Sequence, residues 1–458
     1  MEKEEEDNFS EWYNSIIDKT GLSDKRYPVK GLNIWPPYGW KLMRNIDEKI
    51  RIHFDEMNYD EVSFPALIPE GEFKKEAEHI KGFSNEVYWI THGGDSPLEE
   101  RLVLRPTSET AMYPIFSLWI RNHADLPLRI YQIVNTFRYE TKQTRTFIRV
   151  REIHFIEGHT CHVDFEDSER QIQEDIEIWK KIADEAALPY LMGKRPDWDK
   201  FPGADYTIGV DTFFPSGRSL QIATIHQYKN NFSIPYDIRY TDENGERKYV
   251  HQTTFGISER LVGAIVGIHG DKKGLIIPPR IAPIQVVIVP IPGPGVIEYS
   301  RSIESELRGI SIRVKLDDRD QYTPGWKYND WEEKGVPLRL EIGSREVDGR
   351  RVTCVPRTGG KKTVDLTDFL KDAREMLQEI QESLRERANK TMGSYFTYIT
   401  KMDEANGPMP NYIYWCGKKE CADQIELSGK SILTTFDEGG NCIICHGKGK
   451  KTVISKKY

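Results

Sequence analysis

Apolar residues recur at helical spacing in several long segments of this chain. The pattern predicts amphipathic helices over residues 39–58, 169–187 and 367–389, each with one apolar stripe. Residues 128–157 predict two strands joined by a loop near residues 141–146. The run "EVSFPALIP" contains Pro65 and predicts an edge strand, because proline cannot donate to a sheet ladder.

The pattern changes at "GLIIPPRIAPIQVVIVPIPGPG". Its Pro-Pro pair predicts a domain boundary, and "IQVVIVPI" predicts a buried strand. Strands and helical segments then alternate, which is typical of a compact α/β domain. We therefore expect three domains, over residues 1–281, 282–380 and 381–458.

Composition narrows the class of protein. Charged residues make up 30% of the 458 residues, the net charge is -8, and the mean hydropathy is -0.60. No apolar run reaches the roughly 18 residues of a membrane span, and the acidic N-terminus lacks the pattern of a signal peptide. We expect a cytoplasmic protein without a membrane partner. The overall acidity argues against indiscriminate nucleic-acid binding, which usually requires a broad basic surface.

Six cysteines are too sparse for a disulfide scaffold, but four of them gather near the C-terminus. Cys416 and Cys421 form one pair, and Cys442 and Cys445 form a second pair twenty residues later. Paired cysteines at this spacing are typical of a tetrahedral thiolate zinc site. The alternatives are four unrelated cysteines, or a site in which His446 replaces one thiolate. Four thiolates leave no open position, so we expect a structural Zn2+.

The stretch "FRYETKQTRTFIRVREIHF" (137–155) concentrates positive charge in an acidic chain. Strand periodicity places Arg138 and Glu140 on one face, and Arg149 and Arg151 on one face of the returning strand. A cross-strand salt-bridge ladder is the alternative, but the arginines outnumber their acidic partners. Unpaired guanidinium groups suit phosphate, because they offer planar bidentate hydrogen bonds. The sequence has neither Gly-x-Gly-x-x-Gly nor a Walker lysine, so we expect any nucleotide to be held by arginines on an antiparallel sheet.

"FRYE", the basic loop and "RVRE" together resemble motif 2 of the class II aminoacyl-tRNA synthetases. "FGISERL" resembles their motif 3, and the predicted helix at 39–58 followed by Pro65 resembles motif 1, the dimer-forming element. "RPTSET", "FIEGHT", "QIATIHQYKNNFS" and the cysteine-rich tail are similar to the prolyl-tRNA synthetases of the archaeal and eukaryotic type. The resemblance covers nearly the whole chain. It implies an α+β fold with an antiparallel catalytic sheet, an α/β anticodon-binding domain and a C-terminal zinc-binding α/β domain, assembled as a homodimer.

The resemblance assigns residues to the nucleotide. Arg138 would bridge the amino-acid carboxylate and the α-phosphate, where charge builds during in-line attack. Arg149 would reach the outer phosphates, and Arg260 would stack on the adenine. Arg138 and Arg260 are the implied catalytic residues, and no general base is needed because the substrate carboxylate is already ionised. The residues implied to bind ATP, some of them through Mg2+, are Arg138, Glu140, Arg149, Gln221, Thr224, Ser258 and Arg260.

The resemblance also assigns an amino-acid pocket. Glu109 would accept from the secondary ammonium of proline, and Phe155 would form an apolar wall for its ring. Alternatively, Thr107 and Glu109 are a helix-capping pair and Phe155 belongs to the core. The sequence departs from the family at Ile153, where related enzymes usually place an aromatic residue beside the adenine. The residues implied to bind proline are Thr107, Glu109, Arg138, Phe155 and His226.

A third site is expected in the middle domain, where "TPGWKYNDWEEKGVPLRLEIG" resembles the anticodon-binding domain of this subclass. Between residues 338 and 362 there are seven basic residues against three acidic ones, a local footprint for tRNA phosphates or a solvated strand face. Glu341 and Arg345 are candidates for reading anticodon guanines. The tail "GKGKKTVISKKY" is either a further tRNA contact or solvated.

The resemblance implies a ligase that forms prolyl-adenylate from L-proline and ATP, then esterifies tRNA(Pro). A synthetase for histidine, threonine or glycine is the alternative within the class. A synthetase-like protein that binds RNA without catalysis is the alternative outside it. The interval from Arg138 to Arg260 spans 122 residues and leaves no room for the large editing insertion of bacterial relatives. We therefore expect no cis-editing of mischarged alanine.

Overall fold

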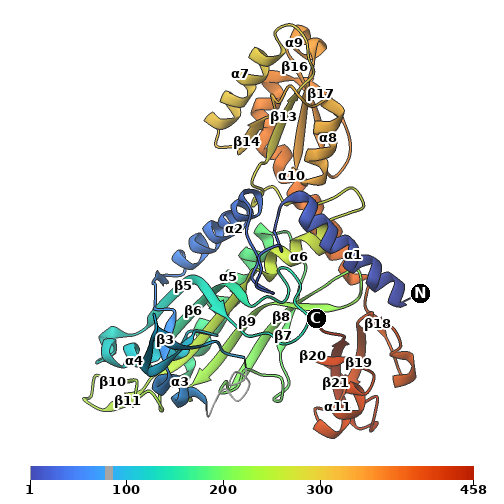
Figure 1. Ribbon diagram of the computed structural model, residues 1–458. Helices are drawn as coiled ribbons and strands as arrows, with labels where there is room; N and C mark the ends of the chain where they lie inside the picture. Colours follow the sequence, from blue (N-terminus) through green and yellow to red (C-terminus); the bar gives the residue numbers. More distant parts are fainter. Residues whose placement is uncertain (1, 78–85) are drawn as a thin grey trace.

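Three large sheets and two smaller ones organise the chain, which we describe over residues 2–77 and 86–458 from a computed structural model. We call its parts the core unit (residues 2–284), the middle unit (285–393) and the C-terminal unit (394–458). Figure 1 shows the middle unit above the core unit, with the C-terminal unit beside the core sheet. Among the described residues, no helix combines the length and apolarity needed to cross a membrane.

The core unit is built on a seven-stranded sheet, in the order β1-β5-β6-β12-β9-β8-β7. The β1–β5 pair is parallel and every other neighbouring pair is antiparallel. The strands are β1 (Asp60–Glu61), β5 (Leu128–Phe137), β6 (Glu152–His162), β7 (Leu191–Lys194), β8 (Tyr206–Phe213), β9 (Ser219–Lys229) and β12 (His251–Ser258).

Helices cover one face of this sheet. Helix α2 (Pro37–Asp55) packs on α5 (Phe165–Glu185), and α5 lies against β6, β9 and β12. Ile46 of α2, Ile172 of α5 and Ile156 of β6 share one buried core. The apolar stripes of both predicted helices are therefore confirmed, and they leave the opposite face of the sheet for a site.

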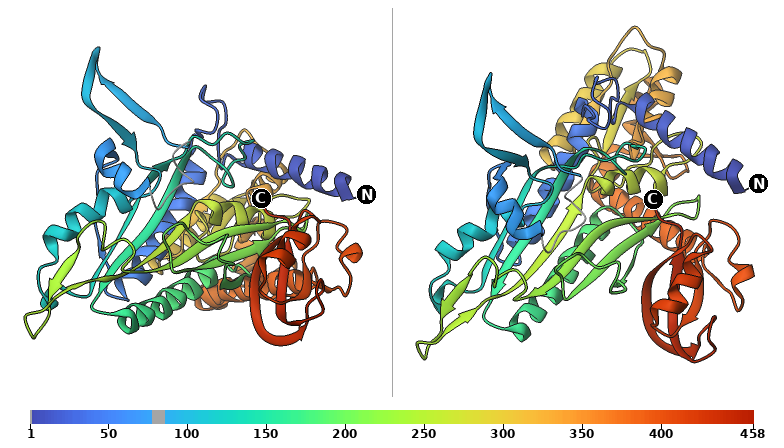
Figure 2. Two further views of the ribbon diagram at one scale, coloured as in Figure 1. Left: turned by 90° about the horizontal axis from the view of Figure 1, so that it is seen from below. Right: turned by 60° about the horizontal axis from the view of Figure 1, so that its bottom comes forward.

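The remaining core elements frame this sheet. The edge strand predicted for "EVSFPALIP" does not form as one strand, because Pro65 lies in the connection between β1 and β2. The short β1 is the edge of the core sheet and pairs with β5. Strands β3 and β4 form a hairpin that projects from the core unit (Figure 2). The bounds are α1 (Glu2–Thr20), β2 (Leu67–Pro69), α3 (Glu70–Ala77), β3 (Trp89–Gly93), β4 (Ser96–Leu104), α4 (Glu109–Trp119), η1 (His123–Asp125), β10 (Arg239–Thr241), β11 (Arg247–Tyr249) and α6 (Arg260–His269).

The predicted hairpin at 128–157 forms, but its connection is longer than expected. Strand β5 ends at Phe137 and β6 begins at Glu152, so the expectation that Arg138, Glu140, Arg149 and Arg151 occupy strands is wrong. The Arg138 amide still donates to the Arg151 carbonyl at 2.9 Å, but the Glu140 amide turns back to the Arg138 carbonyl at 2.7 Å. This tight turn ends the ladder and sets the charged side chains in a connection over the cavity.

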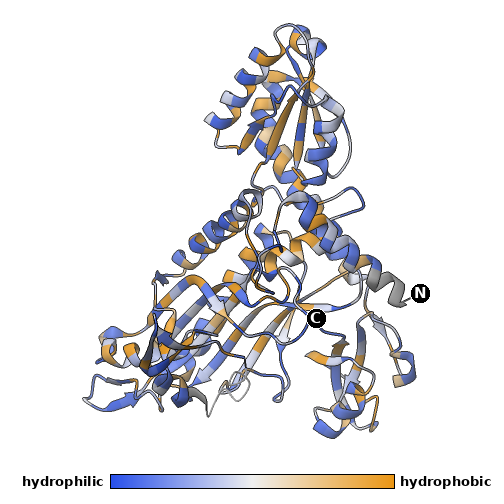
Figure 3. Cartoon of the chain, in the orientation of Figure 1, coloured by the Kyte–Doolittle hydropathy of each residue, from blue (hydrophilic) through white to orange (hydrophobic). Residues whose placement is uncertain are grey.

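The middle unit holds a five-stranded sheet, in the order β14-β13-β15-β16-β17. Strand β13 pairs in parallel with β14 and β15, and the other pairs are antiparallel. Figure 3 colours its central strands as hydrophobic, as expected for a sheet buried between helices. The elements are β13 (Val286–Pro290), α7 (Val296–Gly309), β14 (Val314–Leu316), α8 (Pro324–Glu333), β15 (Leu338–Ile342), α9 (Ser344–Gly349), β16 (Arg351–Pro356), β17 (Lys362–Asp365) and α10 (Leu366–Gly393).

Helix α10 connects the middle unit to the rest of the chain. The expected boundary at residue 380 falls inside this continuous helix of 28 residues. The C-terminal unit follows it with a four-stranded sheet in the order β18-β19-β21-β20. Its elements are β18 (Thr397–Tyr398), η2 (Met402–Glu404), β19 (Asn411–Trp415), α11 (Lys419–Glu426), β20 (Ser431–Asn441) and β21 (Lys448–Ser455).

Candidate functional site

A cavity of about 320 Å³ opens on the face of the core sheet that α2 and α5 leave uncovered. This volume is at the lower end of the range for small-molecule sites. All the side chains expected to bind ATP or proline line it, so residues far apart in sequence meet at one place. They are Thr107, Glu109, Arg138, Glu140, Arg149, Phe155, Gln221, Thr224, His226, Ser258 and Arg260.

Arginines gather at one side of the cavity. Arg138 donates through Nε to the Pro106 carbonyl at 3.1 Å, and Arg149 lies 3.7 Å from the Glu140 carboxylate. Arg260 begins α6 and donates to the carbonyls of Ile148 at 2.9 Å and Gln221 at 3.1 Å. These backbone contacts fix the direction of the guanidinium groups before any ligand enters.

The electrostatics of this side favour an anion. Burial, followed by the positive charges of Arg138 and Arg149, lowers the pKa of Arg260 to about 10. Burial also lowers the pKa of Arg138. Holding several guanidinium charges together away from water costs free energy, and a polyphosphate that pairs with them offsets that cost.

Glu109 occupies the other side of the cavity. It is 3% exposed and begins α4. One carboxylate oxygen accepts a hydrogen bond from the Thr107 hydroxyl, and Oε1 accepts from the Tyr228 hydroxyl at 3.0 Å. The N-cap of α4 is Ser108, without a side-chain capping bond, so Thr107 and Glu109 do not form the helix-capping pair considered above.

His226 is neutral at this side of the cavity. Burial lowers its pKa to about 3, and the nearby His159 contributes in the same direction. Its Nδ1 lies 2.8 Å from the Thr207 hydroxyl, and the ring of Phe201 lies 4.8 Å from the imidazole ring. A carboxylate, a neutral imidazole and aromatic rings together suit a small ammonium with an apolar body.

Strand β6 supplies a row of side chains to the cavity. Ile153 and Phe155 line it, and so do Glu157 and His159, which the sequence analysis did not single out. Alternation with period two along β6 would have found both. Phe155 is half-buried in the cavity wall rather than in the core. Its ring fits because Gly256 of the neighbouring strand β12 has no side chain, and a Cβ there would lie 3.1 Å from the ring.

Glu157 and His159 stabilise the floor of this pocket. The Glu157 carboxylate accepts from Ser108, from Gln132 at 3.0 Å and from His159 at 3.2 Å. Burial raises the pKa of Glu157, but the hydrogen bonds from His159, Ser108 and Gln132 outweigh it and lower the pKa overall. An ionised Glu157 therefore completes a buried polar network that includes Ser108, the residue before Glu109.

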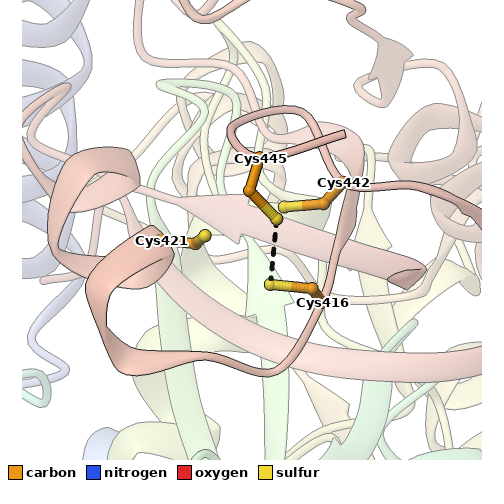
Figure 4. Close-up of side chains that lie close together, drawn as sticks. All are labelled: Cys416, Cys421, Cys442 and Cys445. Carbon is orange, nitrogen blue, oxygen red and sulfur yellow. Dashed lines mark hydrogen bonds between the residues drawn. The ribbon is translucent and has the colours of Figure 1, made fainter. Parts of the chain in front are cut away.

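The four clustered cysteines converge in the C-terminal unit (Figure 4). Their sulfur atoms lie within 4.8 Å of one another, and the Cys445 and Cys416 sulfurs are 3.7 Å apart. With Zn–S bonds of about 2.3 Å, the edge of a tetrahedral thiolate site is roughly 3.8 Å. Burial raises the pKa of Cys442, but backbone amides of Cys445, Ile444 and Cys416 bring it down to about 7. The residues therefore fit Zn2+, and His446 is not part of the cluster.

The candidate anticodon residues differ in their surroundings. Glu341 is buried and ion-paired with Arg339 at 2.9 Å and Lys361 at 2.6 Å, whereas Arg345 is exposed on α9. Arg357, counted in the basic footprint, is instead bound to Asp271 of the core unit at 2.5 Å. It anchors the middle unit to the core unit, and the footprint is smaller by that charge.

Comparisons with known proteins match this architecture. The family profile described as the tRNA synthetase class II core domain (G, H, P, S and T) matches residues 88–269, and the anticodon binding domain matches residues 285–387. The proline–tRNA ligase of Thermoplasma volcanium is 56% identical, over 100% of both chains. That of Thermococcus kodakarensis is 52% identical, over 97% of this chain and 96% of its own.

A solved structure extends the match to three dimensions. The prolyl-tRNA synthetase of Giardia lamblia, in complex with prolyl-adenylate, is 34% identical with a TM-score of 0.95, covering 99% of this chain and 98% of its own. Identity of this extent shared with proline–tRNA ligases, over the whole length of the chain, goes beyond a likeness of fold. The chain belongs to the proline–tRNA ligase family of class II aminoacyl-tRNA synthetases.

Proposed function

We propose that this chain activates L-proline with ATP and transfers the prolyl group to the 3' end of tRNA(Pro). The observation that carries the proposal is the division of one cavity into an arginine-rich side and a side formed by Glu109, Phe155 and His226. Full-length identity with proline–tRNA ligases supports the same reaction. No observation favours a second function.

In the first step, a carboxylate oxygen of proline attacks the α-phosphate of ATP, and pyrophosphate leaves. Arg138 lines the cavity within the electrostatic reach of both Glu109 and Glu140, and it would stabilise the charge that builds on the α-phosphate. Arg149 and Arg260 would hold the outer phosphates and the adenine side. The reaction needs no base, so its rate depends on positioning and electrostatics. Mg2+ would enter with ATP, and Glu140, Gln221 and Thr224 offer the oxygen ligands that it prefers.

The proline ring and its ammonium are recognised separately in this proposal. Glu109, held by Thr107 and Tyr228, would accept from the ammonium. Phe155 would form the wall for the ring, and Ile153 would pack on the adenine in place of the usual aromatic residue. In the second step, a hydroxyl of the terminal ribose of tRNA attacks the prolyl carbonyl carbon, and AMP leaves.

The remaining parts of the proposal concern assembly. The middle unit would hold the anticodon, with Glu341 and Arg345 as candidate base contacts. A structural Zn2+ would be held by the thiolates of the C-terminal unit. We also propose a homodimer, because α2 is the element expected to form the interface and it exposes Trp40 and Ile52. The proposed location is cytoplasmic. Light scattering at the working concentration tests the dimer.

ATP–pyrophosphate exchange over the twenty amino acids tests the proposed reaction. We expect exchange with L-proline. Exchange with another amino acid but not proline would refute the specificity. A folded protein with no exchange at all would favour the non-catalytic RNA-binding alternative.

A further inference from the structure

The segment between β7 and β8 forms part of the cavity wall. Asp199, Lys200 and Phe201 line the cavity beside His226. The Phe201 amide donates at 2.9 Å to the Thr207 hydroxyl, the same hydroxyl that pairs with His226. The position of Phe201 therefore sets the shape of the proposed proline side.

The other side of this segment contacts the C-terminal unit through Trp198. Its ring meets Trp415 edge-on, with centroids 5.7 Å apart and planes at 85°. The Lys419 ammonium lies 4.4 Å from the centre of the Trp198 ring, and the indole N–H donates to Glu426 at 3.4 Å. These partners come from residues 415–426, which include Cys416 and Cys421.

Two further contacts join the segment to the C-terminal unit. Asp199 is ion-paired with Lys457 at 2.6 Å. Arg195 is buried. It is ion-paired with Asp211 of the core unit at 2.7 Å and donates to the Leu433 carbonyl of the C-terminal unit at 3.0 Å. The segment is thus attached to the C-terminal unit at its first residue, Arg195, and near its middle, at Trp198 and Asp199, and it lines the cavity at Phe201.

The cysteine cluster orders the surface on which Trp198 rests. Trp415 directly precedes Cys416, and its indole N–H donates at 3.1 Å to the Lys418 carbonyl between the first two cysteines. Lys419 and Glu426 are the first and last residues of α11, which contains Cys421. A change in the cysteine cluster therefore changes the surface beneath Trp198.

We infer that the C-terminal unit holds the proline side of the catalytic cavity in shape, with Trp198 as the positioning residue that connects the cysteine cluster to Phe201. This inference rests on the proposed function, because it assigns proline to the side of the cavity that Phe201 forms. Trp198 does not line the cavity. It acts through the backbone of residues 199–201, so its loss affects proline more than ATP.

Trp198→Ala in the full-length, metal-loaded protein tests the inference. We expect the KM for proline in ATP–pyrophosphate exchange to rise about tenfold, and the KM for ATP to change less than about twofold. Trp198→Phe keeps the edge-on ring contact and is expected to retain most of the affinity. Trp326→Ala is the matched control, because Trp326 is 43% exposed, against 37% for Trp198, and lies in the middle unit. Its kinetics without tRNA are expected to equal those of the wild type.

A second readout does not depend on turnover. We expect hydrogen exchange of residues 196–203 to accelerate in Trp198→Ala and after removal of metal from the wild type, with α6 unchanged. Direct proline binding by calorimetry is expected to weaken in both. In Trp198→Ala, metal removal is expected to add little further loss of proline affinity, because the connection is already broken.

Three outcomes would overturn the inference. One is a folded Trp198→Ala protein with wild-type proline KM and wild-type exchange of residues 196–203. Another is an equal rise of both KM values, with a lower melting temperature and faster exchange throughout the core unit. The third is a full additional loss of proline affinity on metal removal from Trp198→Ala. Wild-type protein that exchanges pyrophosphate with another amino acid but not proline refutes the proposed function instead.

Discussion

Replacing Tyr228 by phenylalanine removes one hydroxyl group beneath the proposed proline site. That hydroxyl donates to Glu109 at 3.0 Å and accepts from the Thr254 hydroxyl at 3.0 Å, and all three residues are buried. In Tyr228→Phe the Glu109 carboxylate keeps the hydrogen bond from the Thr107 hydroxyl but loses the one from the Tyr228 hydroxyl. A hydrogen bond to a charged group contributes about 1.5–3 kcal/mol, which predicts a fall in kcat/KM for proline of roughly 10- to 150-fold.

The assay is ATP–pyrophosphate exchange with proline varied at saturating ATP, together with a thermal melt. Tyr240→Phe is the control, because its hydroxyl donates at 3.0 Å to the neutral Val163 carbonyl and the residue does not line the cavity. We expect that control to keep wild-type kinetics. If Tyr228→Phe folds and retains the wild-type kcat/KM for proline, Tyr228 does not orient Glu109 and the reasoning is wrong.

Three other predictions concern stability, metal and fidelity. Burial raises the pKa of Asp175 from 3.8 to about 7, so the folded state binds this proton more tightly than the unfolded state, and stability falls as pH rises from about 4 to about 7. Asp175→Asn removes that loss. In urea unfolding, we expect the free energy of unfolding of the variant minus that of the wild type to be larger at pH 8 than at pH 5. An equal difference at both pH values would contradict the raised pKa of Asp175. Chelation is expected to release one zinc per chain and expose four additional reactive thiols, measured with a metal indicator and a thiol reagent, whereas Cys421→Ser is expected to lose the metal when purified. Folded protein that never contained zinc would end that prediction. Alanyl-tRNA(Pro) incubated with the enzyme is expected to remain charged at the rate seen in buffer, and faster deacylation would reveal an editing activity.

The sequence predicted best where one periodicity extends over many residues. The amphipathic stripes of α2, α5 and α10 were found because each buries one side against a single core. The connection between β5 and β6 was misread because its alternating charges imitate a strand. The turn that ends the ladder depends on one backbone hydrogen bond, from Glu140 to Arg138. That bond leaves no signature in side-chain pattern.

The residues of the candidate site also differ in how far the sequence could predict them. Glu157 and His159 were within reach of a period-two argument along β6, because they alternate with Phe155. Tyr228 and Trp198 were not, because their roles depend on partners distant in the sequence: Tyr228 meets Glu109, and Trp198 meets Trp415. Gly193 of β7 illustrates the limit, since its missing side chain makes room for Thr434 of β20. No local pattern relates those two positions.

Helix α10 has a consequence for how this protein can be divided. Its 28 residues span about 42 Å at about 1.5 Å per residue. The first half packs in the core of the middle unit, Gln381 and Arg387 then bind backbone carbonyls of the core unit, and Met392 packs with the C-terminal unit. One inserted residue would turn everything beyond it by about 100° and move it by about 1.5 Å. The helix therefore fixes both the distance and the relative rotation of the units that pack along it. The three units are not interchangeable modules, and a chimera that exchanges any one of them must carry the whole helix with it.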